Sequence, residues 1–272
     1  MPELPEVQST LNGLLDFVPK NKINKVVIHF PTLRYPIPNN IDSDWSNKYI
    51  LKIQRHAKYL FFFSNKRYLV FHLGMSGTLR LQKPQSPKKK HDHVEFILSN
   101  GLSLIYNDPR RFGFILDGTI ESYKSRYINN LGIDALSSSL NLNALIKIVN
   151  KKTKIKELLM NQKFIGGIGN IYASEILYAA RINPHSISCN LPAKSIKKLL
   201  YSIKRVLNKA IKLGGSSISN YYGVTNKTGH FQINFMVYSR NNKKCKSCTG
   251  RISKEIIAQR STFFCNSCQI YY

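Results

Sequence analysis

The C-terminal fold is decided by the stretch CKSCTGRISKEIIAQRSTFFCNSC, residues 245–268. It contains two Cys-x-x-Cys pairs, Cys245/Cys248 and Cys265/Cys268, which sixteen residues separate. This spacing is typical of a four-thiolate tetrahedral zinc site, in which each pair supplies two sulfurs from a tight turn. The segment between the pairs alternates enough to form a β-hairpin. We therefore predict one structural zinc ion, bound by these four cysteines.

The fifth cysteine, Cys189, stands alone, and the N-terminus MPELPE is acidic where a signal peptide would be basic. Paired cysteines in such a chain indicate a metal site in a reducing compartment, not disulfides, so we expect a cytoplasmic protein. No apolar run is long enough to span a membrane, and no membrane partner is expected. Four-cysteine modules occur in many unrelated proteins, so this one does not identify the activity.

The charge is strongly unbalanced. Lys and Arg number 41 against 14 Asp and Glu, which gives a formal net charge of +27. Such an excess is typical of a protein that binds a polyanion. The chain is also rich in Asn, Ile, Tyr and Lys together, so part of the excess reflects a composition in which Lys is the default surface residue. Because no isolated basic amphipathic helix is present, nucleic acid is favoured over anionic membrane.

The first part of the chain combines one helix with many short strands. Apolar residues at helical spacing predict a helix that starts at Leu4 and continues to Leu15. The expected strands are Ile23–Phe30, Tyr59–Phe63, Tyr68–His72, Val94–Leu98, Leu102–Tyr106 and Phe112–Leu116. Asn100-Gly101 predicts a hairpin, and Asp117-Gly118 predicts another turn. Short strands with turns between them indicate a β-sandwich or a barrel.

The second part of the chain is predicted to be helical. The expected helices are Leu142–Val149, Ile155–Asn161, Ile171–Ala180 and Ala193–Leu213. Gly214-Gly215 closes the last of these. Two segments are expected to be exposed, mobile loops: Gln82–Lys90, which is rich in Pro and Lys, and Ser216–Phe231, which is polar and contains Gly.

The N-terminus offers a nucleophile. MPELPE is first of all a good helix start, because Pro suits the first turn and acidic residues suit the positive end of the helix dipole. If Met1 is removed, Pro2 also presents a secondary amine, and an α-amino group titrates near about 8. Attack on C1′ of a deoxynucleotide would expel the base and leave an iminium ion, which can act as an electron sink for elimination of the 3′ phosphate. Glu3 is placed to move protons at the sugar.

Motifs along nearly the whole chain resemble those of bacterial formamidopyrimidine-DNA glycosylases, which are bifunctional glycosylases and abasic-site lyases. The motifs are MPELPEV at residue 1, RHAKYL around Lys58, HLGMSGTLR around Met75, KHDHVEF around His91, NDPRRFG around Arg110, GGIGNIYASE around Asn170 and AQRSTFFCNSCQ around Arg260. Each is weak alone, and together they are specific.

The resemblance implies an α+β protein of three domains. Residues 1–130 would form the N-terminal helix with a catalytic β-sandwich, residues 131–235 a helical helix–two-turn–helix DNA-binding domain, and residues 236–272 a four-cysteine zinc finger. The substrate would be damaged double-stranded DNA, and the chain would be a monomer. The pocket that recognises the damaged base is expected near Ser216–Phe231.

The resemblance also implies four catalytic residues. Pro2 would be the nucleophile that forms a Schiff base, and Glu3 would donate and accept protons at the sugar. Lys58 would assist β-elimination, and Arg260 would hold phosphate and serve the δ-elimination. Without the resemblance, Lys58 would be taken as a solvated charge and Arg260 as an exposed turn residue.

Six residues match positions of the family that contact DNA. The matches are His91, Arg110, Lys151 and Asn170, together with Met75 and Phe112. Met75, Arg110 and Phe112 would fill the gap that the extruded nucleotide leaves, as apolar wedges do when a base is taken out of the stack. Read alone, Met75 and Phe112 would be core residues and His91 a surface imidazole.

Three functions remain open from the sequence. The leading one is base excision repair of oxidised purines, such as 8-oxoguanine and formamidopyrimidines, with strand cleavage by β,δ-elimination. The second is a related enzyme of the endonuclease VIII group, which acts on oxidised pyrimidines. The third is a non-catalytic zinc protein that binds nucleic acid. Composition and cysteines fit the third equally well, but it gives no reason for Pro2-Glu3 beside Lys58.

Overall fold

The computed structural model describes residues 2–123, 129–216 and 231–272. These residues form two compact units. The first contains the chain up to Asn129 together with residues 213–216, and the second contains residues 130–212 and 231–272. Each unit is described separately below.

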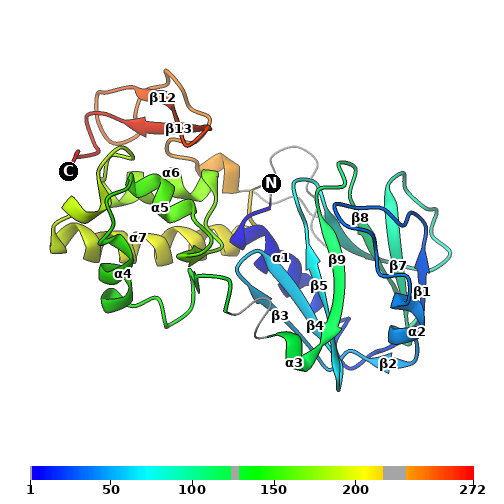
Figure 1. The fold of residues 1–272 in the computed structure, drawn as a ribbon. Helices are drawn as coiled ribbons and strands as arrows, with labels where there is room; N and C mark the ends of the chain where they lie inside the picture. Colours follow the sequence, from blue (N-terminus) through cyan, green and yellow to red (C-terminus); the bar gives the residue numbers. More distant parts are fainter. Residues whose placement is uncertain (1, 124–128, 217–230) are drawn as a thin grey trace. The chain divides into compact units, whose positions relative to one another are not determined.

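The first unit is a β-sandwich, as predicted (Figure 1). One sheet has the order β2-β1-β7-β8-β6, with bounds Lys48–Tyr49, Lys22–Ile28, Asp92–Leu98, Ser103–Asn107 and Thr78–Gln82. The other has the order β3-β4-β5-β9, with bounds Lys52–His56, Tyr59–Phe63, Arg67–His72 and Phe114–Thr119. Neighbouring strands are antiparallel throughout both sheets.

One apolar core lies between the two sheets. Phe96 and Leu104 point into it from the first sheet, and Leu60 and Phe71 from the second, all of them buried. Helix α1, Leu4–Leu14, packs against β3 and β4 and adds its apolar face to the same core. The predicted helix therefore forms for the predicted reason, which is burial of one apolar stripe.

The two turn predictions have opposite outcomes. Asn100-Gly101 joins β7 and β8, and Gly101 adopts φ +77°, so the hairpin prediction is confirmed. The turn predicted at Asp117-Gly118 is wrong, because both residues lie inside β9. Gly118 is needed there for packing: a Cβ at this position would lie 2.6 Å from the hydroxyl oxygen of Tyr68 on β5.

Several strand boundaries also differ from the prediction. The last strand of the sandwich begins at Phe114 and not at Phe112. Strands β3 and β6 were not predicted, because residues such as Lys52, Arg55 and Arg80 interrupt their apolar pattern. Arg80 is nevertheless 6% exposed, since Asp92 on β7 pairs with its guanidinium. Such a partner, 12 residues away in sequence, is invisible to a local pattern.

A long connection between β1 and β2 contains the short helix α2, Ile41–Trp45. Trp45 is fully buried, and its indole N–H donates to Asp117 at 3.1 Å. Directly after β9 comes the short helix α3, Ile120–Tyr123. The predicted loop Gln82–Lys90 is free of helix and strand after Gln82, in agreement with the prediction. Of the predicted loop Ser216–Phe231, residues 217–230 lie outside the described residues.

The second unit is helical, with bounds close to the prediction. Its helices are α4 (Leu142–Val149), α5 (Ile155–Met160), α6 (Asn170–Ala180) and α7 (Ala193–Lys212). Nearly all of α6 is buried, because α5, α7 and the C-terminal hairpin pack around it. Single 3-10 turns, η2 (Ser188–Asn190) and η3 (Phe231–Asn234), complete the helical elements, and β10 (Ile133–Asp134) pairs in parallel with β11 (Ile165–Gly166).

The turn between α5 and α6 is held by one glutamine. Gln162 donates through Nε2 to the carbonyls of Met160 and Ile168, and its Oε1 accepts from the N–H of Gly167. Gly167 adopts φ +106°, which suits only glycine. The glycine cluster therefore shapes the connection between two helices, which is the helix–two-turn–helix arrangement that the resemblance implied.

The C-terminal hairpin consists of β12 (Ile252–Ile257) and β13 (Arg260–Cys265), which pair antiparallel. Its cysteine ends face a small apolar cluster that includes Tyr178 of α6 and Val237. Across the described residues, no helix is both long enough and apolar enough to cross a membrane.

Candidate active site and DNA-binding surface

The start of α1 holds Pro2 and Glu3 in buried positions. Glu3 is the N-cap residue, 1% exposed, and its backbone N–H donates to Oε2 of Glu6 at 2.9 Å. The other oxygen of Glu6 accepts from the backbone N–H and the hydroxyl of Ser216, at 2.7 and 2.9 Å. One buried carboxylate thus joins the helix start to residues more than two hundred positions later. This network orients the backbone that carries Pro2.

Lys58 lies in the turn between β3 and β4, next to Ala57, which adopts φ +53°. It is 8% exposed, so the interpretation as a solvated charge is wrong. Arg55 on β3 donates to the side chain of Gln8 on α1 at 2.7 Å and to the carbonyl of Ala57 at 3.0 Å. The helix that carries Pro2 is therefore fastened to the hairpin that carries Lys58.

His72, at the end of β5, lies close to Lys58. Burial, and after it the positive charges of Lys58 and Arg34, lower the pKa of His72 to about 4. Its ring stacks on Phe114, with 5.1 Å between the centroids, and its Nδ1 accepts from the N–H of Gly74 at 3.2 Å. The imidazole is consequently neutral at physiological pH, and Nε2 is the position left to carry its proton.

Two loops present Met75, Arg110 and Phe112 at the same rim of the sandwich. Met75 is 39% exposed and Phe112 46%, so the reading of these two residues as core is wrong. The guanidinium carbon of Arg110 lies 4.8 Å from the centroid of the Phe112 ring. The two loops approach so closely that a Cβ on Gly74 would lie 2.3 Å from the backbone nitrogen of Gly113.

The buried carboxylate of Asp108 holds both loops. It accepts from the hydroxyl of Ser76 at 2.5 Å, from the N–H of Arg110 at 3.3 Å and from the N–H of Gly113 at 2.8 Å. The N–H of Asp108 donates in turn to the carbonyl of His91, which is half-buried and adopts φ +72°. Four of the predicted DNA-contacting residues therefore belong to one hydrogen-bonded rim.

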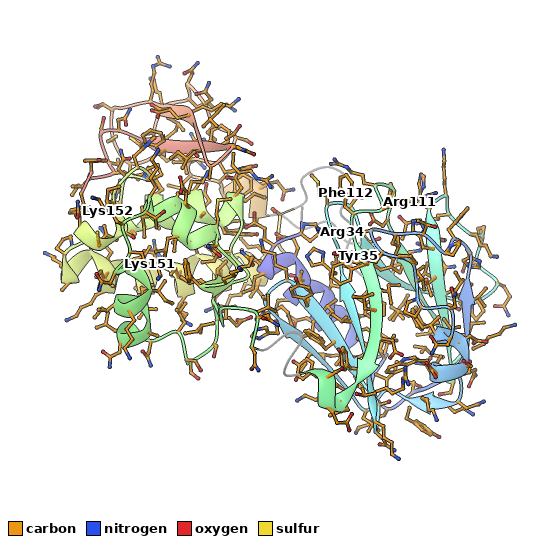
Figure 2. All side chains as sticks on the ribbon, in the orientation of Figure 1. Arg34, Tyr35, Arg111, Phe112, Lys151 and Lys152 are labelled. Carbon is orange, nitrogen blue, oxygen red and sulfur yellow. The ribbon has the colours of Figure 1, made fainter. Side chains whose placement is uncertain are left out.

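The other two predicted DNA contacts lie in the second unit. Lys151 is exposed between α4 and α5 (Figure 2). Its ammonium lies 4.9 Å from the ring centroid of Phe164. Asn170 is the first residue of α6 and half-buried. Its Nδ2 donates to the carbonyl of Ser261 on β13 at 2.9 Å. Asn170 is thereby attached to the strand that begins with Arg260.

A fully buried lysine completes this attachment. The ammonium of Lys156 on α5 donates to Asn170 Oδ1 at 2.7 Å, to Thr262 Oγ1 at 2.6 Å and to the carbonyl of Ser261 at 3.3 Å. An ammonium has three protons, so each of them has an acceptor. This cluster fixes the hairpin against α5 and α6 from the inside.

Arg260 is exposed and follows a tight turn. Ala258 and Gln259, the two turn residues, adopt φ +48° and +57°. Positive φ at both positions is the geometry of the two-residue hairpin turn that matches the twist of the strands, and it normally favours Asn and Gly. The hairpin thus presents Arg260 directly after a strained turn, whose conformation the two paired strands maintain.

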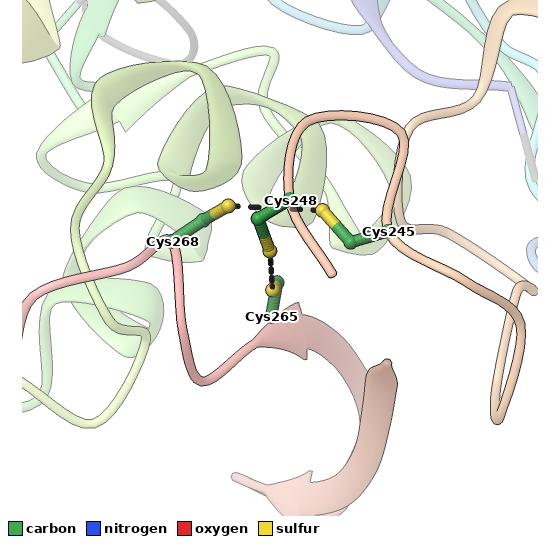
Figure 3. Close-up of side chains that lie close together, drawn as sticks. All are labelled: Cys245, Cys248, Cys265 and Cys268. Atoms are coloured by element: carbon green, nitrogen blue, oxygen red, sulfur yellow. Dashed lines mark hydrogen bonds between the residues drawn. The ribbon is translucent and has the colours of Figure 1, made fainter. Parts of the chain in front are cut away.

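The four cysteines of the zinc site come together at the other end of the hairpin (Figure 3). All four sulfurs lie within 4.8 Å of one another. The Cys245–Cys268 and Cys248–Cys265 sulfur pairs are 3.7 and 3.6 Å apart. A tetrahedron with zinc–sulfur bonds of about 2.3 Å requires sulfurs separated by roughly 3.8 Å, so the donor set fits zinc.

Hydrogen bonds to sulfur support the same assignment. The N–H groups of Ser247 and Gly250 point at Cys245 Sγ and Cys248 Sγ, at 3.4 and 3.3 Å. The hydroxyl of Tyr178 lies 3.2 Å from Cys245 Sγ. The two N–H donors stabilise thiolates, which are the form of cysteine that binds a metal.

Comparison with known proteins agrees with this geometry. The family description "Formamidopyrimidine-DNA glycosylase N-terminal domain" matches residues 1–115. The corresponding "H2TH domain" matches residues 131–222, and "Zinc finger found in FPG and IleRS" matches residues 242–270. The formamidopyrimidine-DNA glycosylase of Rickettsia felis is 44% identical over 99% of this chain and 98% of its own length.

The chain belongs to the formamidopyrimidine-DNA glycosylase family. Its members are DNA glycosylases with abasic-site lyase activity, and the chain is accordingly a DNA-binding enzyme with one structural zinc ion. The formamidopyrimidine-DNA glycosylase of Wolbachia pipientis is 42% identical over 99% of the chain and 100% of its own length. The Lactococcus lactis protein in complex with Fapy-dG-containing DNA superposes with a TM-score of 0.91 at 33% identity, covering 98% of this chain and 99% of that one.

Within this glycosylase fold, three polar residues have structural roles that the sequence reasoning missed. They are Glu6, Asp108 and Lys156, each of them buried and each with hydrogen bonds to two separate segments. Glu6 and Asp108 lie inside the motifs MPELPEV and NDPRRFG, so the presence of a carboxylate within each motif was a signal that could have indicated a buried structural role. Lys156 lies among many lysines, and no sequence signal separates it from its solvated neighbours.

Proposed function

We propose that this enzyme excises oxidised purines from duplex DNA and then cleaves the strand, with Pro2 as the nucleophile. The observation that carries the proposal is the start of α1, where Pro2 and Glu3 are buried and oriented by Glu6 on the helix that contacts the Lys58 hairpin. The identity of the lesion comes from the family to which the chain belongs.

The first step forms a bond between the Pro2 nitrogen and C1′ while the bond from C1′ to the base breaks. The base leaves with the bonding electron pair and takes up a proton. The sugar ring then opens, with Glu3 supplying the proton to the ring oxygen, and an iminium ion remains between Pro2 and C1′. The positive end of α1 disfavours the protonated amine, which leaves the nitrogen available for attack.

Strand cleavage follows from the charge of the iminium ion. A secondary amine gives an iminium nitrogen that has no proton to lose, so C2′ becomes acidic. Loss of a C2′ proton and expulsion of the 3′ phosphate is the β-elimination, which the cation of Lys58 assists. A second elimination expels the 5′ phosphate, which Arg260 holds, and water releases Pro2.

The remaining residues bind DNA in this proposal. Met75, Arg110 and Phe112 enter the space of the extruded nucleotide, and an apolar wedge of this kind needs the exposure that these side chains have. His91, Lys151 and Asn170 hold the backbone.

We further propose that each of the three predicted domains has its own role. Residues 1–130 would carry the catalytic residues and the wedge, and residues 131–235 would bind the DNA backbone. Residues 236–272 would form the zinc hairpin that presents Arg260. The protein would act as a monomer on DNA in the cytoplasm of a bacterium, without a membrane partner. Sedimentation with and without one DNA duplex tests the monomer, since a 2:1 complex would contradict it.

Borohydride trapping tests the chemistry. Duplexes with a single 8-oxoguanine opposite cytosine, a single oxidised pyrimidine, or a preformed abasic site are mixed with enzyme and reductant, and the adduct is mapped by peptide sequencing. We expect an adduct at Pro2 with 8-oxoguanine, and none with an enzyme whose N-terminus is acetylated. An adduct with the pyrimidine alone would move the chain to the endonuclease VIII type of activity. Tight binding without any adduct would indicate a non-catalytic protein.

A further inference from the structure

The outer face of α7 carries a stripe of positive charge that the proposed function does not use. After its first residue, this helix has eight exposed side chains, and at about 100° per residue they all fall within roughly a third of its circumference. Because each residue adds about 1.5 Å, this α7 stripe is about 27 Å long. Six of its eight members are cations: Lys194, Lys197, Lys198, Tyr201, Arg205, Asn208, Lys209 and Lys212.

No acidic residue balances these cations. The sequence of α7 contains neither Asp nor Glu. Among the residues that the structure describes, none forms an ion pair or a hydrogen bond with the six cationic side chains of the stripe. By contrast, Lys204 at the edge of the stripe donates to the carbonyl of Ser137 at 2.6 Å. Like charges three or four positions apart on a helix repel one another, and an anion bound along the stripe removes this repulsion.

The lysine-rich composition of the chain does not account for the stripe. Helix α4 belongs to the same unit, and its exposed residues are Asn143, Ile146 and Lys147, with one cation among three. Asn and Ile thus reach the exposed face of a helix here as readily as Lys does. On α7 the cations are six among eight, and they are aligned along the whole helix.

The opposite face of α7 decides against a membrane as the partner. Ile196, Leu199, Ile203 and Leu207 are buried, and α7 packs on α6 and α4. A basic amphipathic helix that binds a bilayer inserts its apolar face into the lipid, and this face of α7 is already covered by the protein. A protein partner is also disfavoured, because interfaces between proteins have an apolar centre and Tyr201 is the one large apolar side chain of the stripe.

The middle of the stripe is shaped to receive an anion. Tyr201 is 64% exposed, and the guanidinium carbon of Arg205 lies 5.7 Å from its ring centroid. A guanidinium that lies over an aromatic ring can still offer two parallel N–H groups to a phosphate. Arg205 and Lys209 also line a hollow of about 270 Å³ together with Arg181, the residue that ends α6. Three cations of two different helices therefore border one recess.

The α7 stripe is turned away from the hairpin that carries Arg260. Both α7 and β13 pack on α6, and Figure 1 shows α6 between α7 and the hairpin. Because the buried face of α7 is turned toward α6, its exposed face points to the other side of this unit. Asn170 bonds to Ser261 and therefore belongs to the hairpin side. A straight duplex held by Asn170 and Arg260 does not run along the α7 stripe.

We propose that the α7 stripe binds the phosphate backbone of a second duplex segment while the first segment is held at Asn170 and Arg260. Over about 27 Å a duplex carries about 16 phosphate charges, so the six cations have enough partners. The contact is electrostatic and independent of base sequence, so the stripe accepts undamaged DNA. An enzyme with two such faces passes from one segment to another without leaving DNA. This inference goes beyond the proposed function, because it concerns undamaged DNA and involves no chemistry.

Transfer between duplexes tests the proposal. The enzyme is bound to a fluorescent duplex with one tetrahydrofuran abasic-site analogue, and an undamaged, unlabelled duplex is added in increasing excess. Transfer through a complex with two duplexes makes the dissociation rate rise with the concentration of the added duplex. In a variant that combines Lys197→Gln, Lys198→Gln and Arg205→Gln, we expect this rise to be at least about tenfold weaker. The Kd of the first duplex should change by less than about twofold, since salt screens charges on the far side of the unit.

The matched control removes three exposed lysines of the first unit, through Lys48→Gln, Lys52→Gln and Lys66→Gln. Gln is nearly as good a helix former as Lys and Arg, so the α7 variant should fold, and its zinc content and circular dichroism verify this. Sedimentation in excess duplex at low salt gives a second readout. We expect one protein with two duplexes for the wild type and the control, and one protein with one duplex for the α7 variant.

Three results would overturn the proposal. The first is a wild-type dissociation rate that does not depend on the added duplex. The second is an equal loss of transfer in the α7 variant and in the control. The third is binding of polyglutamate, but not of a second duplex, to the wild type and not to the α7 variant, which would make an acidic protein the partner of the stripe. None of these results touches the proposed chemistry, because borohydride trapping at Pro2 does not depend on α7.

Discussion

The two ends of this chain are stabilised in different ways. The sandwich closes two sheets and α1 over one large apolar core, in which Trp45, Phe62 and Phe96 are almost fully buried. The zinc hairpin has only a small cluster, part of which consists of its own cysteines. A module of this size cannot bury enough apolar surface to fold by itself, and metal ligation supplies the difference.

This difference matches the proposed roles of the two regions. In the proposed mechanism, formation of a bond at C1′ requires Pro2, Glu3 and Lys58 in fixed positions, and a packed core holds side chains in place. The proposed role of Arg260 requires that its side chain extend to a DNA phosphate, and a hairpin fixed at its other end by zinc presents it in an exposed position. The proposed catalytic residues of the sandwich are therefore held in place by apolar packing, whereas Arg260 is held by the zinc site and by the hydrogen bonds of Lys156.

The largest effect is expected from blocking the amine. A two-residue extension before Pro2 turns its nitrogen into an amide, which cannot attack C1′, and we expect base excision to fall by at least about 10³-fold. Unfolding of the sandwich and binding of zinc should not change. Single-turnover cleavage of the 8-oxoguanine duplex measures the loss, and proteolytic removal of the extension should restore the activity. Full activity of the extended protein would remove Pro2 from the chemistry.

Loss of zinc should unfold the hairpin and leave the stability of the sandwich unchanged. In Cys265→Ser the hairpin loses one of four ligands and should unfold, so binding of the abasic-analogue duplex should weaken by about 100-fold. Trp45, the single tryptophan of the chain, lies in the sandwich and reports on that region alone. We expect its fluorescence-detected midpoint in urea to stay unchanged. Cys189→Ser, at an exposed cysteine outside the cluster, is the control. A parallel shift of the Trp45 midpoint would contradict the comparison.

Replacement of the buried lysine should weaken the second region alone. Lys156→Met keeps the volume but leaves three acceptors without a donor, at a cost of about 2–3 kcal/mol. Zinc release as a function of urea should move to lower concentrations, and strand cleavage should slow because Asn170 and the Arg260 strand lose their shared anchor. Lys163→Met, at an exposed lysine of the same unit, is the control. Identical zinc release in both variants would exclude the anchor.

The last effect appears only at acid pH and belongs to the sandwich. The pKa of His72 is lowered from 6.5 to about 4, first by burial and then by Lys58 and Arg34. The unfolded chain therefore binds a proton below pH 6.5 that the folded chain accepts only near pH 4. Stability is lost in this window as pH falls, by at most about 1.4 kcal/mol per pH unit.

The variant His72→Asn should flatten this part of the curve. Urea unfolding, monitored through Trp45 between pH 4.5 and 7, measures it. An unchanged slope would mean that another group takes up the proton. Zinc release has its own acid dependence, because thiolates must stay deprotonated, but it should not differ between the wild type and His72→Asn.

The sequence by itself determined the features that depend on neighbours along the chain. The zinc site follows from the spacing of four cysteines, since two short turns must supply two sulfurs each. The hairpin at Asn100-Gly101 follows from a backbone conformation that glycine tolerates. Helix α4 begins and ends at the predicted residues, because its capping residue Asn141 and its apolar spacing act within a few turns. The order of the motifs was sufficient to identify the family.

The tertiary structure decided what depends on partners far away in sequence. Asp117-Gly118 has the composition of a turn, yet it continues β9, because Tyr68 packs on Gly118 and Arg67 and Trp45 bond to Asp117. Glu6 and Lys156 are common residue types whose burial follows only from hydrogen bonds to segments that fold against them. A local pattern records which residues avoid water, but it does not record which distant groups satisfy a buried charge, and such charges are what position this site.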